Sequence, residues 1–137
     1  MKSVKKFVYY CDHCNKRSLS KFHMNKHENG CTLNPQRKCK FCEGVDLQEI
    51  TEAIKNRYEI IEEKDKEYGF IFVKVNWTGE PVTLEEIETL ADGCPNCMLS
   101  IIRQSGLVGY PFGGDFTFDY KTKCSEWYAG LLKNYED

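Results

Sequence analysis

The chain has 137 residues, of which 29% are charged and 41% hydrophobic, and its formal net charge at pH 7 is −2. This length suits one compact domain, or a small module joined to a domain of about 95 residues. No run of 18 apolar residues occurs and residues 1–10 hold no apolar stretch long enough for a signal peptide, so we expect a soluble cytoplasmic protein with no membrane partner.

The charge is divided unevenly along the chain. Residues 1–42 carry ten Lys or Arg against Asp12 and Glu28, a net charge of +8, whereas residues 43–137 carry nine against nineteen acidic residues, a net charge of −10. Such an asymmetry is typical of a basic end that meets phosphate or another acidic surface. The simpler interpretation is that the two halves neutralise one another.

The first predicted elements are a hairpin that starts at Tyr9 and a helix after it. The hairpin turns at Cys11-Asp12-His13-Cys14, and Ser18 or Ser20 can cap the helix. Gly30 is expected to end it before Cys31. One side of this ββα unit should carry three residues: Leu19, Met24 and His27.

Four side chains of this unit have the spacing C-x2-C-x12-H-x3-C. They are Cys11, Cys14, His27 and Cys31. Three thiolates and one imidazole at this spacing can close a tetrahedron around a zinc ion. The 21 residues that they span are too few to bury a core, so the metal would supply the folding energy.

The spacing that starts at Tyr9 resembles the two-cysteine, two-histidine zinc finger in its CCHC variant, over residues 9–31 only. That family usually has a large apolar residue four positions after the second cysteine, where this chain has Ser18, with Leu19 next. A one-residue shift in the hairpin would absorb this departure. The size and layout are also loosely similar to small zinc-finger proteins encoded by bacteriophages and bacteria.

The resemblance implies which residues would face nucleic acid. The corresponding positions on the outer face of the helix are Ser20, His23 and Lys26, and none of them is an Arg or Asn suited to bidentate base reading. Neighbouring cations can neutralise phosphates, above all Lys16, Arg17 and Lys21. Affinity for DNA or RNA without strong sequence specificity is therefore expected. A protein-binding or purely structural finger is the alternative.

After a turn at Asn34-Pro35, the periodicity of apolar residues predicts a helix from Asp46 to about Ile61. A buried strand is predicted over 70–75, and a turn follows at 78–81. Thr83 and Glu86 form a capping box for a short acidic helix that runs to Ala91. Further helices are predicted over 98–104 and from about 120 to 135, with a loop over 110–115 between them.

Two further CxxC pairs, Cys39/Cys42 and Cys94/Cys97, lie 51 residues apart and predict a four-thiolate zinc site. A knuckle followed by a second pair that opens a helix resembles a treble-clef site. The chain would then bind two zinc ions. Disulfides and redox chemistry are the competing interpretations of these pairs.

The remaining candidates point away from catalysis. Zinc deaminases need an H-x-E motif that the chain lacks, and a treble-clef nuclease would need a histidine after residue 28, where none occurs. Cys124 is expected to be a buried core thiol. Three aromatic residues could form a binding patch or be packing: Trp77, Tyr110 and Phe112.

We therefore expect an α+β protein with a basic CCHC finger at 1–34 and an acidic four-cysteine domain at 35–137, the latter with three or four helices and a short sheet. The predicted function is that of a small non-enzymatic regulator that contacts nucleic acid through the finger. The alternative is a protein-interaction module or inhibitor that docks through its acidic domain. The sequence does not determine the partner or the oligomeric state.

Overall fold

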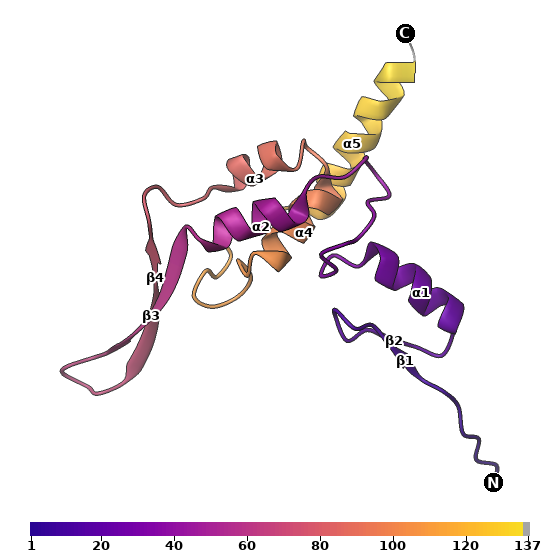
Figure 1. Cartoon of the computed structure of the whole chain (residues 1–137), viewed down its shortest axis with the longest axis horizontal. Helices are drawn as coiled ribbons and strands as arrows, with labels where there is room; N and C mark the ends of the chain where they lie inside the picture. Colours follow the sequence, from indigo (N-terminus) through magenta and orange to yellow (C-terminus); the bar gives the residue numbers. More distant parts are fainter. Residues whose placement is uncertain (136–137) are drawn as a thin grey trace.

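The computed structural model describes the backbone of residues 1–135 and the side chains of residues 1–130. Figure 1 shows an N-terminal ββα unit on one side, a long hairpin on the other, and a group of helices between them. The elements are β1 (Tyr9–Tyr10), β2 (Arg17–Ser18), α1 (Lys21–Gly30), α2 (Leu47–Lys55), β3 (Tyr58–Lys64), β4 (Ile71–Trp77), α3 (Leu84–Leu90), α4 (Pro95–Gln104) and α5 (Tyr120–Tyr135). This is the predicted α+β class.

The N-terminal unit has the predicted hairpin and helix. Strands β1 and β2 pair antiparallel, with Tyr9 opposite Ser18. Helix α1 begins after Ser20, whose hydroxyl accepts a hydrogen bond from the backbone N–H of His23 at 3.3 Å. Such caps satisfy a donor that the first turn leaves without a partner. Of the two predicted capping residues, Ser20 is therefore the one that caps the helix.

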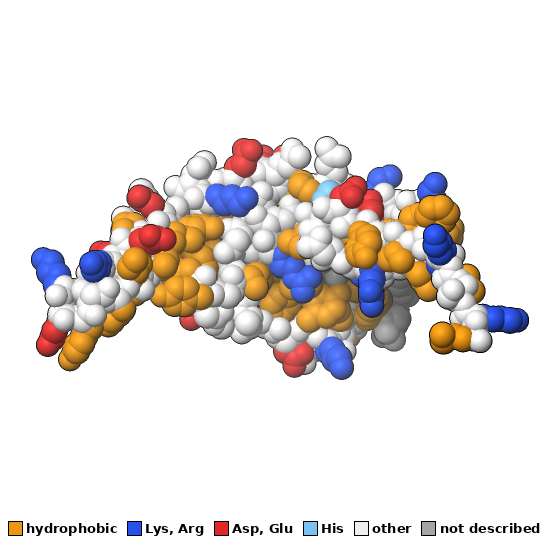
Figure 2. All heavy atoms as spheres, turned by 90° about the horizontal axis from the view of Figure 1, so that it is seen from below, with side chains coloured by type: hydrophobic (Ala, Val, Ile, Leu, Met, Phe, Trp, Pro, Cys, Tyr) orange, Lys and Arg blue, Asp and Glu red, His pale blue; other side chains and the backbone are white. Residues whose placement is uncertain are grey.

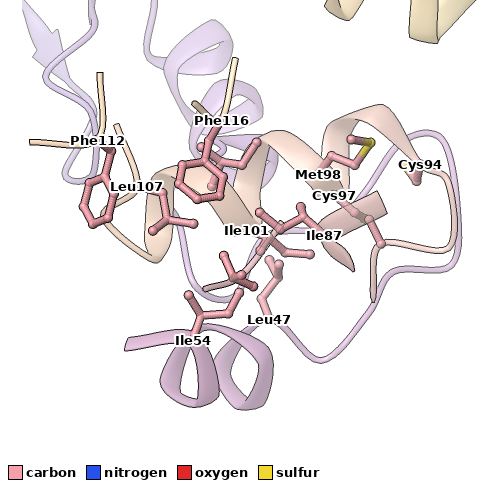
Figure 3. Packing of buried hydrophobic residues seen from close by; sticks show 13 residues of the cluster. Leu47, Ile54, Ile87, Cys94, Cys97, Met98, Ile101, Leu107, Phe112 and Phe116 are labelled. Atoms are coloured by element: carbon pink, nitrogen blue, oxygen red, sulfur yellow. The ribbon is translucent and has the colours of Figure 1, made fainter. Parts of the chain in front are cut away.

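Helix α4 lies at the centre of the main hydrophobic core. Its residues Met98 and Ile101 are fully buried, and they belong to one cluster with Ile54 of α2 and Ile87 of α3 (Figure 3). Helices α2, α3 and α5 all contact α4. The core therefore consists mainly of one apolar helix surrounded by three others.

The predicted helix from Asp46 to Ile61 is wrong in its second half. Helix α2 ends at Lys55, and residues 58–64 instead form β3, which pairs antiparallel with β4. Tyr58 lies opposite Trp77 in this register, with ring centroids 5.4 Å apart. Strand pairing with β4 overrides the helical spacing, and adjacent β-branched residues such as Ile60 and Ile61 favour it.

The other predicted elements are present. The observed strand β4 runs two residues beyond the predicted end. Thr83 caps α3 and accepts a hydrogen bond from the backbone N–H of Glu86 at 3.1 Å. Gly93 follows α3 with φ of +76°, a conformation that glycine adopts without strain. The predicted helices at 98–104 and 120–135 correspond to α4 and α5.

Helix α5 is packed less closely than its sequence predicts. Cys124 is only half-buried, so the expected buried core thiol is wrong. Trp127 is half-buried and Tyr128 is exposed, although the ring of Tyr128 lies edge-on to Phe41. The sequence predicts an apolar stripe along this helix, and the side chains of its last two members, Leu131 and Tyr135, lie outside the described residues. The described part of α5 therefore contributes to the core mainly through Trp127.

Side-chain hydrogen bonds join the N-terminal unit to the helical core. The Gln104 amide donates to the carbonyl oxygens of Thr32 and Asn34 at 2.9 and 3.0 Å. Arg103 donates to the Thr32 hydroxyl at 2.7 Å. Residues next to the predicted boundary at 34/35 are thus held against the end of α4. The division into two domains stays a prediction.

Membrane insertion finds no support in the helices. Among the helices of residues 1–135, none is both long enough and apolar enough to cross a membrane.

Ile101→Ala should destabilise the helical core. The residue is fully buried between helices, so truncation leaves a cavity and should lower the free energy of unfolding by about 2–5 kcal/mol. Ile71→Ala is the matched control, because that isoleucine is 67% exposed and should cost less than about 1 kcal/mol. Urea denaturation followed by circular dichroism measures both. Equal losses in the two variants would contradict the assignment of the core.

Candidate metal centres

The first candidate centre lies between the hairpin and the helix of the N-terminal unit. The ligand atoms of Cys11, Cys14, His27 and Cys31 all lie within 4.8 Å of one another. The Cys14 Sγ and His27 Nε2 atoms are 3.1 Å apart. His27 lies in the last turn of α1, and Cys31 follows that helix directly. The fold therefore brings together all four residues that the sequence pattern selected.

The second candidate centre joins two distant segments of the chain, one at residues 39–42 and one at the start of α4. Cys39 Sγ lies 3.5 Å from Cys94 Sγ, and Cys42 Sγ lies 3.4 Å from Cys97 Sγ. The four sulfur atoms lie within 4.8 Å of one another. Cys94 occupies the N-cap position of α4 and Cys97 lies in its first turn, with Pro95 between them. The partial positive charge of a helix N-terminus favours thiolates at these positions.

The CxxC turns at Cys11–Cys14 and at Cys39–Cys42 have the same local structure. In each, a backbone N–H two residues after the first cysteine donates to its sulfur, from His13 to Cys11 and from Phe41 to Cys39, both at 3.4 Å. A third such bond runs from Gly44 to Cys42 at 3.3 Å. Hydrogen bonds of this kind stabilise a thiolate. This donor arrangement fits a bound cation in both centres.

Burial and hydrogen bonding shift the pKa values of the ligands. Burial raises the pKa of the Cys31 and Cys42 thiols to about 11. The hydrogen bond with Cys97 lowers the pKa of Cys94 to about 5, and the same contact raises the pKa of Cys97. A metal ion must displace protons from the thiols that remain protonated at neutral pH. Metal affinity should therefore fall as the pH falls.

The imidazole of the first centre is in the form that a metal needs. Burial and the nearby charge of Lys16 lower the pKa of His27 below its ordinary value. The neutral ring therefore predominates at pH 7, with a lone pair available. The other two histidines, His13 and His23, are exposed and do not join either cluster.

The predicted role of Leu19 in the N-terminal unit is wrong. This side chain is 63% exposed, whereas Met24 is 3% exposed and belongs to the small core around Cys11 and Cys31. Leu33 packs against that core in its place. It follows Cys31, beyond the spacing that defines the first cluster, so sequence reasoning missed it. The chain supplies the missing apolar side chain from beyond the metal site.

The predicted nucleic-acid contacts lie around the first centre. The side chains of Lys16, Arg17, Lys21, His23 and Lys26 are exposed. Ser20 is half-buried, and its hydroxyl already accepts the capping hydrogen bond from His23. Five of the six predicted residues are therefore accessible to a ligand, and Ser20 has a structural role.

The predicted aromatic patch is divided between core and surface. Phe112 is 5% exposed and makes edge-on contacts with Tyr58, Trp77 and Phe116, with ring centroids 5.2, 6.2 and 5.9 Å away respectively. Tyr110 is 74% exposed. A groove of about 590 Å³ runs beside them, lined by residues of β4, of 81–84 and of 110–116. Phe116 belongs to this site, although nothing in the sequence pattern singled it out.

Comparison of the chain with protein-family models, curated proteins and solved structures found no match. The features of the molecule that bear on its function are therefore the donor geometry, the distribution of charge and the exposed surfaces.

Elemental analysis of the purified protein should return two metal ions per chain. Cys31→Ser should lose one and Cys97→Ser the other, because each substitution removes one donor of a four-donor set. Cys124→Ser is the matched control and should retain both ions, because this cysteine belongs to neither cluster. A single ion in the unsubstituted chain would contradict the pairing of the two clusters with two sites.

Leu33→Ala should weaken metal binding at the first centre. The loss of a partly buried side chain from so small a core should lower the metal affinity of that site by about tenfold. Leu19→Ala, which truncates an exposed side chain, should leave the affinity unchanged. Competition with a chromophoric chelator measures both. The opposite ranking would show that Leu19 is the core residue after all.

Proposed function

We propose that the protein is a non-enzymatic zinc protein that binds nucleic acid through its basic N-terminal unit. Zinc is the metal that suits sites of three thiolates with one imidazole and of four thiolates. On this proposal residues 9–31 form a CCHC-type finger, and Cys39, Cys42, Cys94 and Cys97 form a treble-clef-like site. The ions would stabilise the fold in both places.

A structural role for the zinc follows from the number of donors. Each cluster supplies four protein ligands, which fills a tetrahedral site. Catalytic zinc sites instead keep one position for water or substrate. The donor sets therefore support a binding function and not a hydrolytic one.

The distribution of ion pairs is the main support for nucleic-acid binding by the basic part of the chain. Within the described residues, the four salt bridges all lie between positions 57 and 126, in the acidic half. None of them uses a Lys or Arg of residues 1–42. Figure 2 shows such side chains projecting from the end of the molecule that holds the N-terminal unit. The expectation that the two halves neutralise each other therefore finds no support in side-chain contacts.

Unneutralised cations of this kind suit a phosphate backbone. Each Lys or Arg that contacts a phosphate releases condensed counterions, which yields affinity for DNA and RNA alike. The outer positions Ser20, His23 and Lys26 hold no Arg, Asn or Gln for bidentate base recognition, and Lys26 among them can bond a guanine edge. Binding should therefore be strongly salt-dependent and weakly sequence-dependent.

Reversal of charge at Lys16, Arg17 and Lys21 should reduce nucleic-acid binding. The triple variant to Glu should bind a random 20-base-pair duplex at least about tenfold more weakly at low salt, and the slope of log affinity against log salt should decrease by about 0.9 for each lost phosphate contact. Fluorescence anisotropy across a salt series measures both quantities.

The matched control reverses three exposed lysines of the acidic half, Lys64, Lys66 and Lys121. This variant has the same change in net charge and should bind nearly as well as the unsubstituted chain. Failure of the unsubstituted chain to bind DNA or RNA at low salt would refute the proposed function. Equal losses in the two triple variants would mean that net charge, not the N-terminal unit, determines binding.

A further inference from the structure

Strand β4 has an open edge. The ladder between β3 and β4 is closed at its two ends by hydrogen bonds from Asp65 N to Phe70 O at 2.8 Å and from Thr78 N to Arg57 O at 2.7 Å. Backbone groups alternate between the two edges of a strand. The even-numbered residues of 70–78 therefore face β3, and the odd-numbered residues from Ile71 to Trp77 face away from it.

A tyrosine hydroxyl occupies the middle of this open edge. The Val73 N–H donates to the Tyr110 hydroxyl at 3.2 Å, and the hydroxyl donates to the Val73 carbonyl at 3.2 Å. These are the two backbone groups that a neighbouring strand would pair. Among the described residues, the hydrogen bonds outside the ladder do not involve the backbone of Ile71, Val75 or Trp77. Tyr110 thus takes the place of a strand at one position and leaves the rest of the edge free.

The open edge borders the aromatic groove. Val73, Val75 and Trp77 line one side of it, and Phe112 and Phe116 lie opposite. The far end of the hairpin also exposes apolar side chains, with Ile71 67% exposed and Phe70 and Tyr68 exposed as well. Figure 1 shows the hairpin extending away from the helices, and Figure 2 shows apolar side chains along it. A hairpin of two strands is marginal without further packing, so a third strand would stabilise it.

The charges around the groove favour a basic strand. Asp115 lines the groove, and Glu62 lies opposite Val73 in the ladder. Lys74, the one cation among the lining residues, is held by Glu63 at 2.6 Å. An extended segment with apolar side chains and lysines could pack against the apolar lining of the groove and pair with the acidic residues beside it.

Residues 1–8 of the chain have this chemistry. They form no helix or strand, all eight are exposed, and they carry Val4, Phe7 and Val8 among three lysines. In an extended strand Val4 and Val8 share one face with Lys6 between them. Eight residues span about 26 Å, enough to cover the seven residues of β4. Figure 1 shows this segment leaving the molecule on the side away from the hairpin, so a second copy would have to supply it.

We propose that residues 1–8 of one copy add as a third strand to the open edge of β4 in a second copy. The backbone of the added strand replaces the Tyr110 hydroxyl at Val73, and its apolar side chains enter the aromatic groove. The contact joins two different surfaces, so it is heterologous and can continue from copy to copy. The basic end of one molecule then lies against the acidic half of the next.

Two substitutions test this proposal in opposite directions. Val73→Pro removes an N–H that faces the added strand and not β3, so it should weaken binding of a fluorescent peptide of residues 1–10 to the full chain by about three- to tenfold. Tyr110→Phe removes the hydroxyl that competes for Val73 and should strengthen the same binding by a similar factor. General loss of stability would not strengthen binding.

The controls separate strand addition from nonspecific attraction. Val73→Thr keeps the backbone donor and a β-branched side chain of similar size, so it should bind the peptide more tightly than Val73→Pro does. A peptide with Lys2, Lys5 and Lys6 changed to Glu should not bind. Sedimentation velocity should show concentration-dependent self-association of the full chain that excess peptide reverses.

The proposal is overturned by a chain that stays monomeric at all concentrations, or by a peptide of residues 1–10 that does not bind. Equal affinities in Val73→Pro and Val73→Thr would also overturn it. Circular dichroism tests whether Val73→Pro is folded. If it is unfolded, Tyr110→Phe becomes the deciding variant, because unchanged or weaker peptide binding to that variant contradicts strand addition.

Discussion

The contact between the CxxC pairs Cys39/Cys42 and Cys94/Cys97 is the constraint on which this structure depends. Cys39 and Cys42 meet Cys94 and Cys97 at sulfur distances of 3.4 to 3.5 Å across 55 positions of sequence. Helices α2 and α3 and the β3–β4 hairpin all lie within the loop that this contact closes. Closing so long a loop costs entropy, and ionised thiols would repel each other without a cation. A bound metal ion would offset both costs, which supports the proposed structural role of zinc at this cluster.

Helix α4 connects this constraint to the rest of the molecule. Its first turn carries two of the thiols, its middle forms the hydrophobic core through Met98 and Ile101, and its last residue, Gln104, holds the N-terminal unit by two hydrogen bonds. The second candidate metal centre, core packing and attachment of the basic unit therefore all depend on one helix of ten residues. This arrangement attaches the basic unit to the helical core, while the cations of residues 1–42 form no salt bridge among the described residues.

The two proposed interactions use different ends of the molecule and different physics. Phosphate binding by the basic unit depends on charge and is screened by salt. Strand addition at β4 depends on backbone hydrogen bonds that the Tyr110 hydroxyl satisfies at only one residue. The lysines of residues 1–8 belong to both, since they can neutralise phosphate or meet the acidic border of the groove. Nucleic acid and a second copy would then compete for them.

The sequence by itself determined the two Cys/His clusters that could hold a metal, the α+β class and most element positions, because ligand spacing, capping residues and turn glycines act over a few residues. It did not reveal that residues 58–64 form a strand, that Leu33 replaces Leu19 in the small core, or that Cys124 is only half-buried. These depend on contacts between distant segments, since Tyr58 pairs with Trp77 and Leu33 packs from beyond the last ligand. The open edge of β4 likewise exists only once β3 has paired with its other side. The spacing of nearby residues identifies the candidate metal ligands, whereas contacts between distant segments determine which surfaces remain exposed to a partner.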